Sequence, residues 1–132
     1  MRIIYAGLIA GFVATASLAQ DQGVEQTIQS QIDAFLIDDF ETAFSFASPG
    51  IKRFFGSSER FGQMVQNGYP MVWRPSGVEF LEQRQQGAYT VQKVLVRDAS
   101  GTPHVLEYAM IKTEAGWQID GVQLLAAPPV GA

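Results

Sequence analysis

The sequence predicts an α+β fold in which N-terminal helices pack on a curled four-stranded antiparallel meander sheet. Two observations lead to this expectation. Apolar residues recur with the helical period up to Gly68, and from Gly77 onward they alternate with a period of two. The later segments are separated by turns of only two to four residues, and connections this short join antiparallel neighbours. Helices followed by such a run of strands are typical of an α+β domain.

The first predicted helix runs from Val24 to Asp38, and it carries apolar residues at helical spacing and acidic or amide residues on its other faces. Asp38 is then expected to be the N-cap of a second helix that reaches about Ala47. The reason is Glu41, which lies three residues after Asp38 and completes a capping box. The apolar positions of the first helix are Val24, Ile28, Ile32, Phe35 and Leu36.

A break at Ser48-Pro49-Gly50 ends the second helix, and the residues from Ile51 to Phe55 are predicted to form one short turn. Ser57 or Ser58 can cap a third helix, which ends at Gly68. This helix is expected to turn its apolar residues toward the core. They are Phe61, Met64 and Val65.

Four strands are predicted, over Gly77 to Gln85, Ala88 to Arg97, Thr102 to Thr113 and Trp117 to Leu125. If Lys112 lies opposite Trp117 across the last turn, the same register places Met110 opposite Ile119, Tyr108 opposite Gly121 and His104 opposite Leu125. The more apolar face of these two strands should look toward the helices. It holds His104, Leu106, Tyr108, Met110, Trp117 and Ile119.

The register of the second strand stays open at this point. Lys93 can lie opposite Leu106, which keeps Tyr89 and Val91 with the apolar set, or opposite Glu107, which gains a charge contact. The outer face of the last two strands holds five apolar residues among its polar ones, which is too many for a fully wetted surface. A homodimer through this open sheet face is one way to cover them. They are Val105, Ala109, Ile111, Val122 and Leu124.

Residues 1–19 have the features of a cleavable signal peptide. One positive charge, Arg2, precedes an apolar stretch, and the small residues Ser17 and Ala19 stand three and one positions before the expected cleavage point. The alternative is an uncleaved anchor, but the apolar stretch is shorter than the roughly 20 residues that a membrane-spanning helix needs. We therefore expect a periplasmic or secreted protein that has no membrane anchor after cleavage.

The remaining chain is expected to form a single domain over residues 20–125, followed by a flexible tail over 126–132. The formal net charge of −4 becomes −5 without Arg2, and the basic residues form no patch, which argues against nucleic acid as a partner. The chain contains no cysteine and one histidine, so neither a disulfide nor a metal site is predicted. No nucleotide-binding or nucleophile motif is present, and we expect no cofactor.

Two resemblances extend this interpretation. Helices followed by Arg74-Pro75 and a four-stranded meander that ends in Gly116-Trp117-Gln118-Ile119-Asp120-Gly121 resemble the nuclear-transport-factor-2-like (NTF2-like) or cystatin-like cone fold. Several short motifs are similar to domain-of-unknown-function family 4864, small exported proteins of Gram-negative bacteria. That resemblance implies a periplasmic address and a fold, and it transfers no catalytic residue. The motifs are Gln31-Ile32-Asp33-Ala34-Phe35, Ala47-Ser48-Pro49-Gly50-Ile51, Phe55-Gly56, Gly68-Tyr69-Pro70 and Val72-Trp73-Arg74-Pro75.

Asp33 and His104 are the candidate acid or base residues. His104 is the only side chain whose ordinary pKa lies near neutrality, although a histidine at a strand end is more often a partly exposed polar residue. Enzymes that the cone fold resembles often place a carboxylate and tyrosines inside the cavity, and this suggests Asp33. Helical spacing, however, places Asp33 nearer Gln29 than Ile28 and favours a solvated position.

The segment from Tyr69 to Pro75 is the most unusual in the chain, because two prolines fix its backbone around large side chains. Arg74 could clamp a carboxylate or cap helix carbonyls. The structural alternative is that Tyr69 and Trp73 close one end of the core while Arg74 pairs with an acid such as Glu79 or Asp33. The residues expected to contact a ligand are Tyr69, Trp73, Arg74, Tyr108 and Trp117.

The leading functional hypothesis is a non-catalytic module that binds a small apolar or aromatic ligand, or a partner chain, at the cavity mouth or the open sheet face. The alternative is an isomerase, dehydratase or cyclase that uses Asp33 or His104 as base and Tyr69 or Tyr108 as donor to an oxyanion. A third possibility is an accessory subunit whose role is an oligomeric contact through the sheet.

Overall fold

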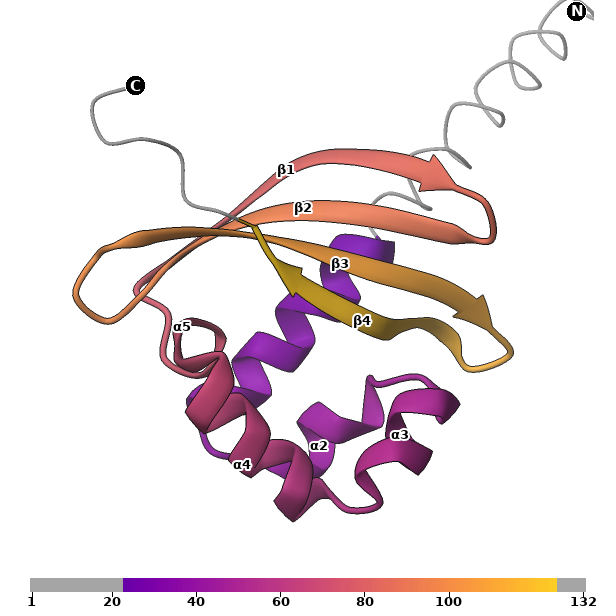
Figure 1. The fold of residues 1–132 in the computed structure, drawn as a ribbon, viewed down its shortest axis with the longest axis horizontal. Coiled ribbons are helices and arrows are strands. Elements are labelled where there is room, and N and C mark those ends of the chain that lie inside the picture. The colour runs from indigo at the N-terminus through magenta and orange to yellow at the C-terminus, as the bar shows by residue number, and fades with distance from the viewer. Residues whose placement is uncertain (1–22, 126–132) are drawn as a thin grey trace, which may run out of the picture.

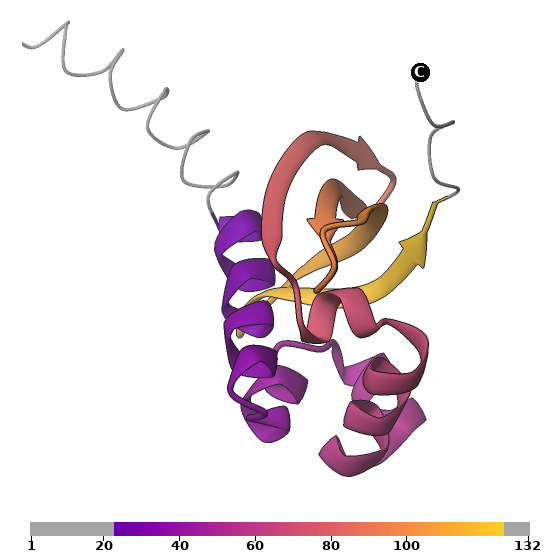
Figure 2. The ribbon, with the colours of Figure 1, turned by 90° about the vertical axis from the view of Figure 1, so that its left-hand side faces the viewer.

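The computed structural model describes residues 23–125, so the predicted signal peptide and the predicted tail lie outside the described residues. Within this range the chain forms helices followed by a four-stranded antiparallel sheet, and this confirms the α+β class (Figure 1). The strand order β1-β2-β3-β4 follows the sequence, so the sheet is the expected meander. It is curled and does not close (Figure 2).

The first described helix covers residues 23–36 and is the longest in the fold. Four of its five predicted apolar positions are buried, with Val24, Ile28 and Ile32 at 0% and Phe35 at 1% exposure, whereas Leu36 at the end of the helix is 43% exposed. The chain then turns at Asp38, which has a positive φ of 58°. The helix therefore ends two residues earlier than the sequence predicts, and Asp38 belongs to the turn.

The second predicted helix has a different N-cap from the expected one. Helix α2 (Phe40–Ser45) is capped by Asp39, whose carboxylate accepts from the backbone N–H of Thr42 at 3.2 Å. The prediction that Asp38 is the cap is wrong, because Asp38 occupies the left-handed turn and its carboxylate binds Trp73 and Arg74 instead.

The following helices are short and well capped. Helix α3 (Pro49–Phe55) is longer than the single turn predicted, because Ser48 caps it and Pro49 fits the first helical position. Helix α4 (Ser58–Gly68) has Ser57 as its cap, one of the two predicted options, and its last residue is Gly68, as predicted. The connector that follows contains a further single-turn helix, α5 (Pro70–Trp73), which the sequence did not predict.

The four strands lie within one residue of the predicted bounds at every end. They are β1 (Gly77–Gln86), β2 (Tyr89–Arg97), β3 (Pro103–Thr113) and β4 (Gly116–Leu124). Lys93 lies opposite Glu107, which settles the register that the sequence left open. Lys112 lies opposite Trp117 and Met110 opposite Ile119, as predicted.

A register shift between Ala109 and Met110 changes the pairing beyond that point. Tyr108 lies opposite Val122 and not Gly121, and the predicted pairing of His104 with Leu125 is also wrong. The cause is one extra residue on β4, which no period-two pattern reveals. Because paired residues share a face, Val122 and Leu124, which lie opposite Tyr108 and Leu106, are on the helix side of the sheet and not on the outer face where they were expected.

The sheet forms one layer and the helices the other (Figure 1). The helix of residues 23–36 runs below the curved strands, and α2, α3 and α4 extend the helical layer below β4 (Figures 1 and 2). A short parallel bridge ties β4 to the helical layer, because Ser48 N–H donates to the carbonyl of Ile119 and Ile119 N–H donates to that of Phe46. The core lies between the two layers, and the predicted inward residues Leu106, Tyr108 and Met110 are at most 1% exposed.

Candidate functional site

A cavity of about 260 Å³ lies between the helical layer and the end of the sheet formed by β3 and β4. The helix of residues 23–36, α3, α4 and α5 contribute to its wall, and so does the segment between α2 and α3. The wall is mostly apolar. Its large apolar side chains include Phe35, Ile51, Phe55, Phe61, Met64 and Ile119.

Aromatic contacts hold one side of this wall in place. The ring of Phe61 lies 6.0 Å from that of Phe35, 5.0 Å from that of Phe44 and 5.7 Å from that of Phe55, measured between centroids. These separations are in the range of favourable aromatic pairs, so four helical segments share one aromatic cluster. Phe35, Phe55 and Phe61 of this cluster line the cavity.

Tyr108 brings an unpaired hydroxyl group to the sheet side of the cavity. Its side chain is 1% exposed, it lies on β3 facing the helices, and it lines the cavity. No residue of the described range 23–125 forms a hydrogen bond with its hydroxyl, which is accessible from the cavity; within the same range, the fully buried side-chain polar atom without a partner is Nε1 of Trp117. Burial, together with the nearby Tyr69, raises the pKa of Tyr108, so this hydroxyl stays protonated at neutral pH and acts as a donor.

Gln31 supplies a second buried polar group to the wall. It is 4% exposed, and its amide nitrogen donates to the carbonyl of Ala43 at 3.0 Å, which ties the first helix to α2. This bond leaves the side-chain carbonyl oxygen of Gln31 as an acceptor at the wall. Gln31 was not among the predicted site residues, although it lies three residues after Ile28 and four before Phe35 and so shares the buried face of the helix.

Tyr69 spans the gap between the helices and the edge strand. It follows the last residue of α4, and its hydroxyl donates to the carbonyl of Val122 on β4 at 3.3 Å. The side chain is half-buried and lines the cavity, so it closes part of the wall. Tyr69 and Tyr108 are the two predicted ligand contacts that the fold brings together at this cavity.

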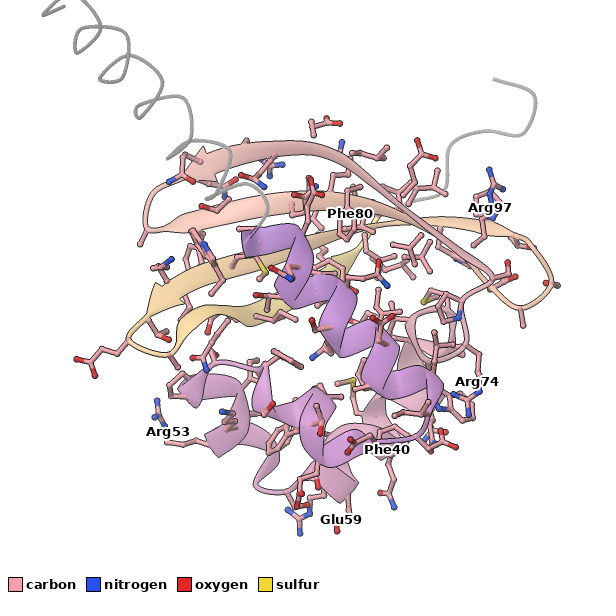
Figure 3. The ribbon with its side chains drawn as sticks, turned by 180° about the vertical axis from the view of Figure 1, so that it is seen from behind. Phe40, Arg53, Glu59, Arg74, Phe80 and Arg97 are labelled. Atoms are coloured by element: carbon pink, nitrogen blue, oxygen red, sulfur yellow. The ribbon has the colours of Figure 1, made fainter. Side chains whose placement is uncertain are left out.

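Trp73 and Arg74 lie elsewhere, at the C-terminal end of the first helix (Figure 3). The guanidinium of Arg74 donates to the carbonyl of Phe35 and to the carboxylate of Asp38, both at 2.8 Å, and it lies 4.4 Å from the Trp73 ring centroid. The indole N–H of Trp73 donates to the same carboxylate at 2.9 Å. These bonds from Trp73 and Arg74 lower the pKa of Asp38. The acid that pairs with Arg74 is therefore Asp38, and the proposed partners Glu79 and Asp33 are wrong.

His104 and Asp98 form a pair at the turn between β2 and β3. The Nε2 atom of His104 lies 2.9 Å from one carboxylate oxygen of Asp98. The other oxygen accepts from the backbone N–H groups of Ser100 and Thr102, so Asp98 holds the turn together. The contact with His104, followed by those with Ser100 and Thr102, lowers the pKa of Asp98 to about 2. His104 borders an open hollow beside Trp73 and Arg74 and does not line the cavity.

The two remaining candidates also lie outside the cavity wall. Asp33 is exposed on the first helix, and its carboxylate accepts from the side chain of Gln29 at 3.0 Å. Trp117 is half-buried against Gly23, at the start of the described chain, and the Nζ atom of Lys112 lies 5.1 Å from its ring centroid. Asp33 and His104 are thus not brought together with each other or with Tyr69 and Tyr108.

The outer sheet face carries a ladder of charged side chains. Arg84 on β1 binds both carboxylate oxygens of Glu107 on β3, at 2.7 and 3.3 Å. Lys93 on β2 lies 3.2 Å from a carboxylate oxygen of Glu82 on β1, although its cross-strand neighbour is Glu107. The homodimer through this face stays a prediction, and any partner would have to accommodate these charges.

Two further searches concern the described residues only. No helix of residues 23–125 is long and apolar enough to cross a membrane. The same residues contain no group of three or more histidine, aspartate or glutamate side chains arranged to hold a metal ion.

Comparison with known families gives one match. The sequence profile described as Domain of unknown function (DUF4864) covers residues 17–132. The chain belongs to this family. No curated protein and no solved structure matches the chain significantly. Membership in DUF4864 confirms the family that the short motifs resemble. It assigns no activity or ligand to the domain, so the function has to be argued from the cavity itself.

Proposed function

We propose that this chain is an exported, non-catalytic module that encloses a small apolar or aromatic molecule in the cavity between the helices and β3–β4. The observation that carries the proposal is the hydroxyl of Tyr108, which has no protein partner and lies at the wall of a mostly apolar cavity. The hydroxyl is accessible from the cavity, and a bound molecule that carries an acceptor can replace water as its hydrogen-bond partner. An apolar cavity with a few convergent polar groups is the usual form of a small-molecule site.

The composition of the wall favours binding over catalysis. Within the described residues the lining contains no carboxylate, imidazole or amine. Its titratable groups are Tyr69 and Tyr108, and the raised pKa of Tyr108 makes that hydroxyl a poor base. The isomerase, dehydratase or cyclase alternative needs Asp33 or His104 at the substrate, and both lie away from the cavity. We therefore place this alternative second.

We also propose that the protein is exported and that its fold is of the NTF2-like cone type. The features of residues 1–19 support export to the periplasm or the medium. A curled meander sheet with helices and a cavity on one side supports assignment to the NTF2-like cone architecture. Export is tested by fractionating cells of the native host and measuring the intact mass of the chain. We expect the chain outside the cytoplasm and beginning at residue 20, and a cytoplasmic chain that retains Met1 would contradict this part.

Ligand binding is tested by blocking the cavity. Val122 is half-buried on the edge strand and lines the cavity, so Val122→Phe should fill part of the space and exclude the ligand. Leu124→Phe is the matched control, because Leu124 lies two residues further along β4, is 44% exposed and does not line the cavity. The measurement is mass spectrometry of the small molecules extracted from each purified protein.

The expected result is one compound that co-purifies in stoichiometric amount with the unchanged chain and with Leu124→Phe, and at least about tenfold less with Val122→Phe. Thermal unfolding of the three proteins shows whether each is folded. If no compound is present above background in the unchanged chain, or if Val122→Phe retains as much as the control, the cavity is not the binding site.

A further inference from the structure

The size of the cavity limits the size of its ligand. A protein cavity of about 150 Å³ lined by apolar side chains accepts benzene. By simple scaling, a space of about 260 Å³ accommodates about ten non-hydrogen atoms. The ligand is therefore smaller than most cofactors and comparable to a substituted benzene ring.

The charge of the wall limits the ligand further. An ionised group taken out of water needs a charged partner, and the described lining contains neither arginine nor lysine for an anion nor a carboxylate for a cation. A neutral molecule fits this environment best.

The remaining polar group is the Tyr108 hydroxyl, a hydrogen-bond donor that has no acceptor among the described residues. Resting on the proposed function, we infer that the ligand is a neutral, ring-sized molecule that carries a carbonyl or ether oxygen, and that Tyr108 selects it by donating a hydrogen bond to that oxygen. Tyr69 has a different role, because its hydroxyl already donates to the carbonyl of Val122. Tyr108 is thus the residue that determines specificity for an oxygen-bearing ligand.

Three probes of nearly the same shape separate the contribution of the ligand oxygen from the effect of ligand charge. Acetophenone carries a carbonyl oxygen, α-methylstyrene replaces this oxygen with a methylene group, and benzoate is an anion of similar size. Affinity for each is measured by isothermal titration or by ligand-observed NMR on the full chain after removal of bound material. One neutral hydrogen bond corresponds to about a fivefold preference, so acetophenone should bind about five times more tightly than α-methylstyrene, and benzoate should bind more weakly than both.

Tyr108→Phe removes the donor and leaves the ring that forms the wall. In this variant the preference for acetophenone should fall from about fivefold to none, while α-methylstyrene binds at least as well as before. Tyr89→Phe is the matched control, because Tyr89 is 39% exposed and does not line the cavity. It should retain the full preference.

The possible outcomes separately test the role of Tyr108, the neutral ligand class and the proposed function. Equal affinity of the unchanged chain for acetophenone and α-methylstyrene would overturn the role of Tyr108 and leave apolar binding intact. The same conclusion follows if Tyr108→Phe keeps the preference. Tighter binding of benzoate would overturn the neutral ligand class. If none of the probes binds, the proposed function itself fails for a ligand of this size.

Discussion

Two regions of the molecule contain aromatic and polar side chains that look suited to binding, and they differ in one respect. In the Arg74 corner, which consists of Phe35, Asp38, Trp73 and Arg74, the prominent polar groups bind one another. In the cavity, the hydroxyl of Tyr108 has no partner among the described residues. The polar groups of the Arg74 corner are therefore satisfied by one another, while the cavity contains a hydrogen-bond donor that is free to bind a ligand.

Residue type alone does not distinguish a binding site from a structural cluster. Trp73 and Arg74 are the kind of side chains enriched at interfaces. Here they close the end of the first helix, whose last carbonyl groups need donors, and an arginine satisfies such carbonyls well. The informative property is whether a buried polar group is satisfied by the protein, and this becomes visible only after folding.

The largest expected effect comes from breaking the Arg74 corner. Arg74→Ala removes the donors to the Phe35 carbonyl and to Asp38, and it should lower the free energy of unfolding by about 1–2 kcal/mol, chiefly through the lost bond to the Phe35 carbonyl because the pair with Asp38 is exposed. Ligand binding in the cavity should be unchanged, because Arg74 does not line it.

Urea unfolding of the purified chain measures this effect. Arg53→Ala is the control, since Arg53 is exposed on α3 and points away from the Arg74 corner (Figure 3). It should change the free energy of unfolding by less than about 0.5 kcal/mol. An Arg74→Ala protein as stable as the control would show that the corner does not hold the helix end.

The sequence predicted much of the fold because local rules decide most of it. The buried stripe from Val24 to Phe35 and the alternation along β3 follow directly from periodicity. The failures lie where distant segments compete for the same residue. Asp38 is a good cap by sequence, but Trp73 and Arg74 take its carboxylate.

The candidate site was only partly predictable. Tyr69 and Tyr108 were named as ligand contacts and both line the cavity. Whether a cavity persists depends on how the phenylalanines pack, and the sequence does not state this. The extra residue in β4 turned Val122 toward the cavity, and the buried role of Gln31 depends on the carbonyl of Ala43, twelve residues away.

A smaller effect is expected in the cavity. Tyr108→Phe removes a hydroxyl that has no protein partner and is accessible from the cavity, so the free energy of unfolding of the ligand-free variant should change by less than about 0.5 kcal/mol. Tyr69→Phe removes a hydroxyl that does have a partner, and it should lower stability by about 0.5–1 kcal/mol. Thermal and urea unfolding of ligand-free proteins compare the two.

A loss of stability for Tyr69→Phe without a loss for Tyr108→Phe is the sharpest test of this difference, because the chemical change is identical and both side chains line the same cavity. Equal losses of stability would mean that the Tyr108 hydroxyl is already satisfied. In that case the cavity would resemble the Arg74 corner, and the main reason to expect a ligand would disappear.

The smallest effect is expected at Asp98, a second structural cluster, and it appears only in acid. Contacts with His104, Ser100 and Thr102 hold the pKa of Asp98 at about 2, below its ordinary value of 3.8. A carboxylate whose pKa is lowered by folding stabilises the folded state above its unfolded pKa, and this contribution is lost as the pH falls through the folded value. The unchanged chain should therefore lose stability between about pH 4 and pH 2.

Asp98→Asn keeps a side-chain oxygen for the turn and removes the titrating group. The difference in free energy of unfolding between the unchanged chain and this variant should be constant above about pH 4 and shrink toward pH 2. Urea unfolding at a series of pH values measures it. Parallel curves through this range would mean that the contacts of Asp98 in the folded turn do not favour its charged form, and that this turn, unlike the Arg74 corner, is not held by its carboxylate.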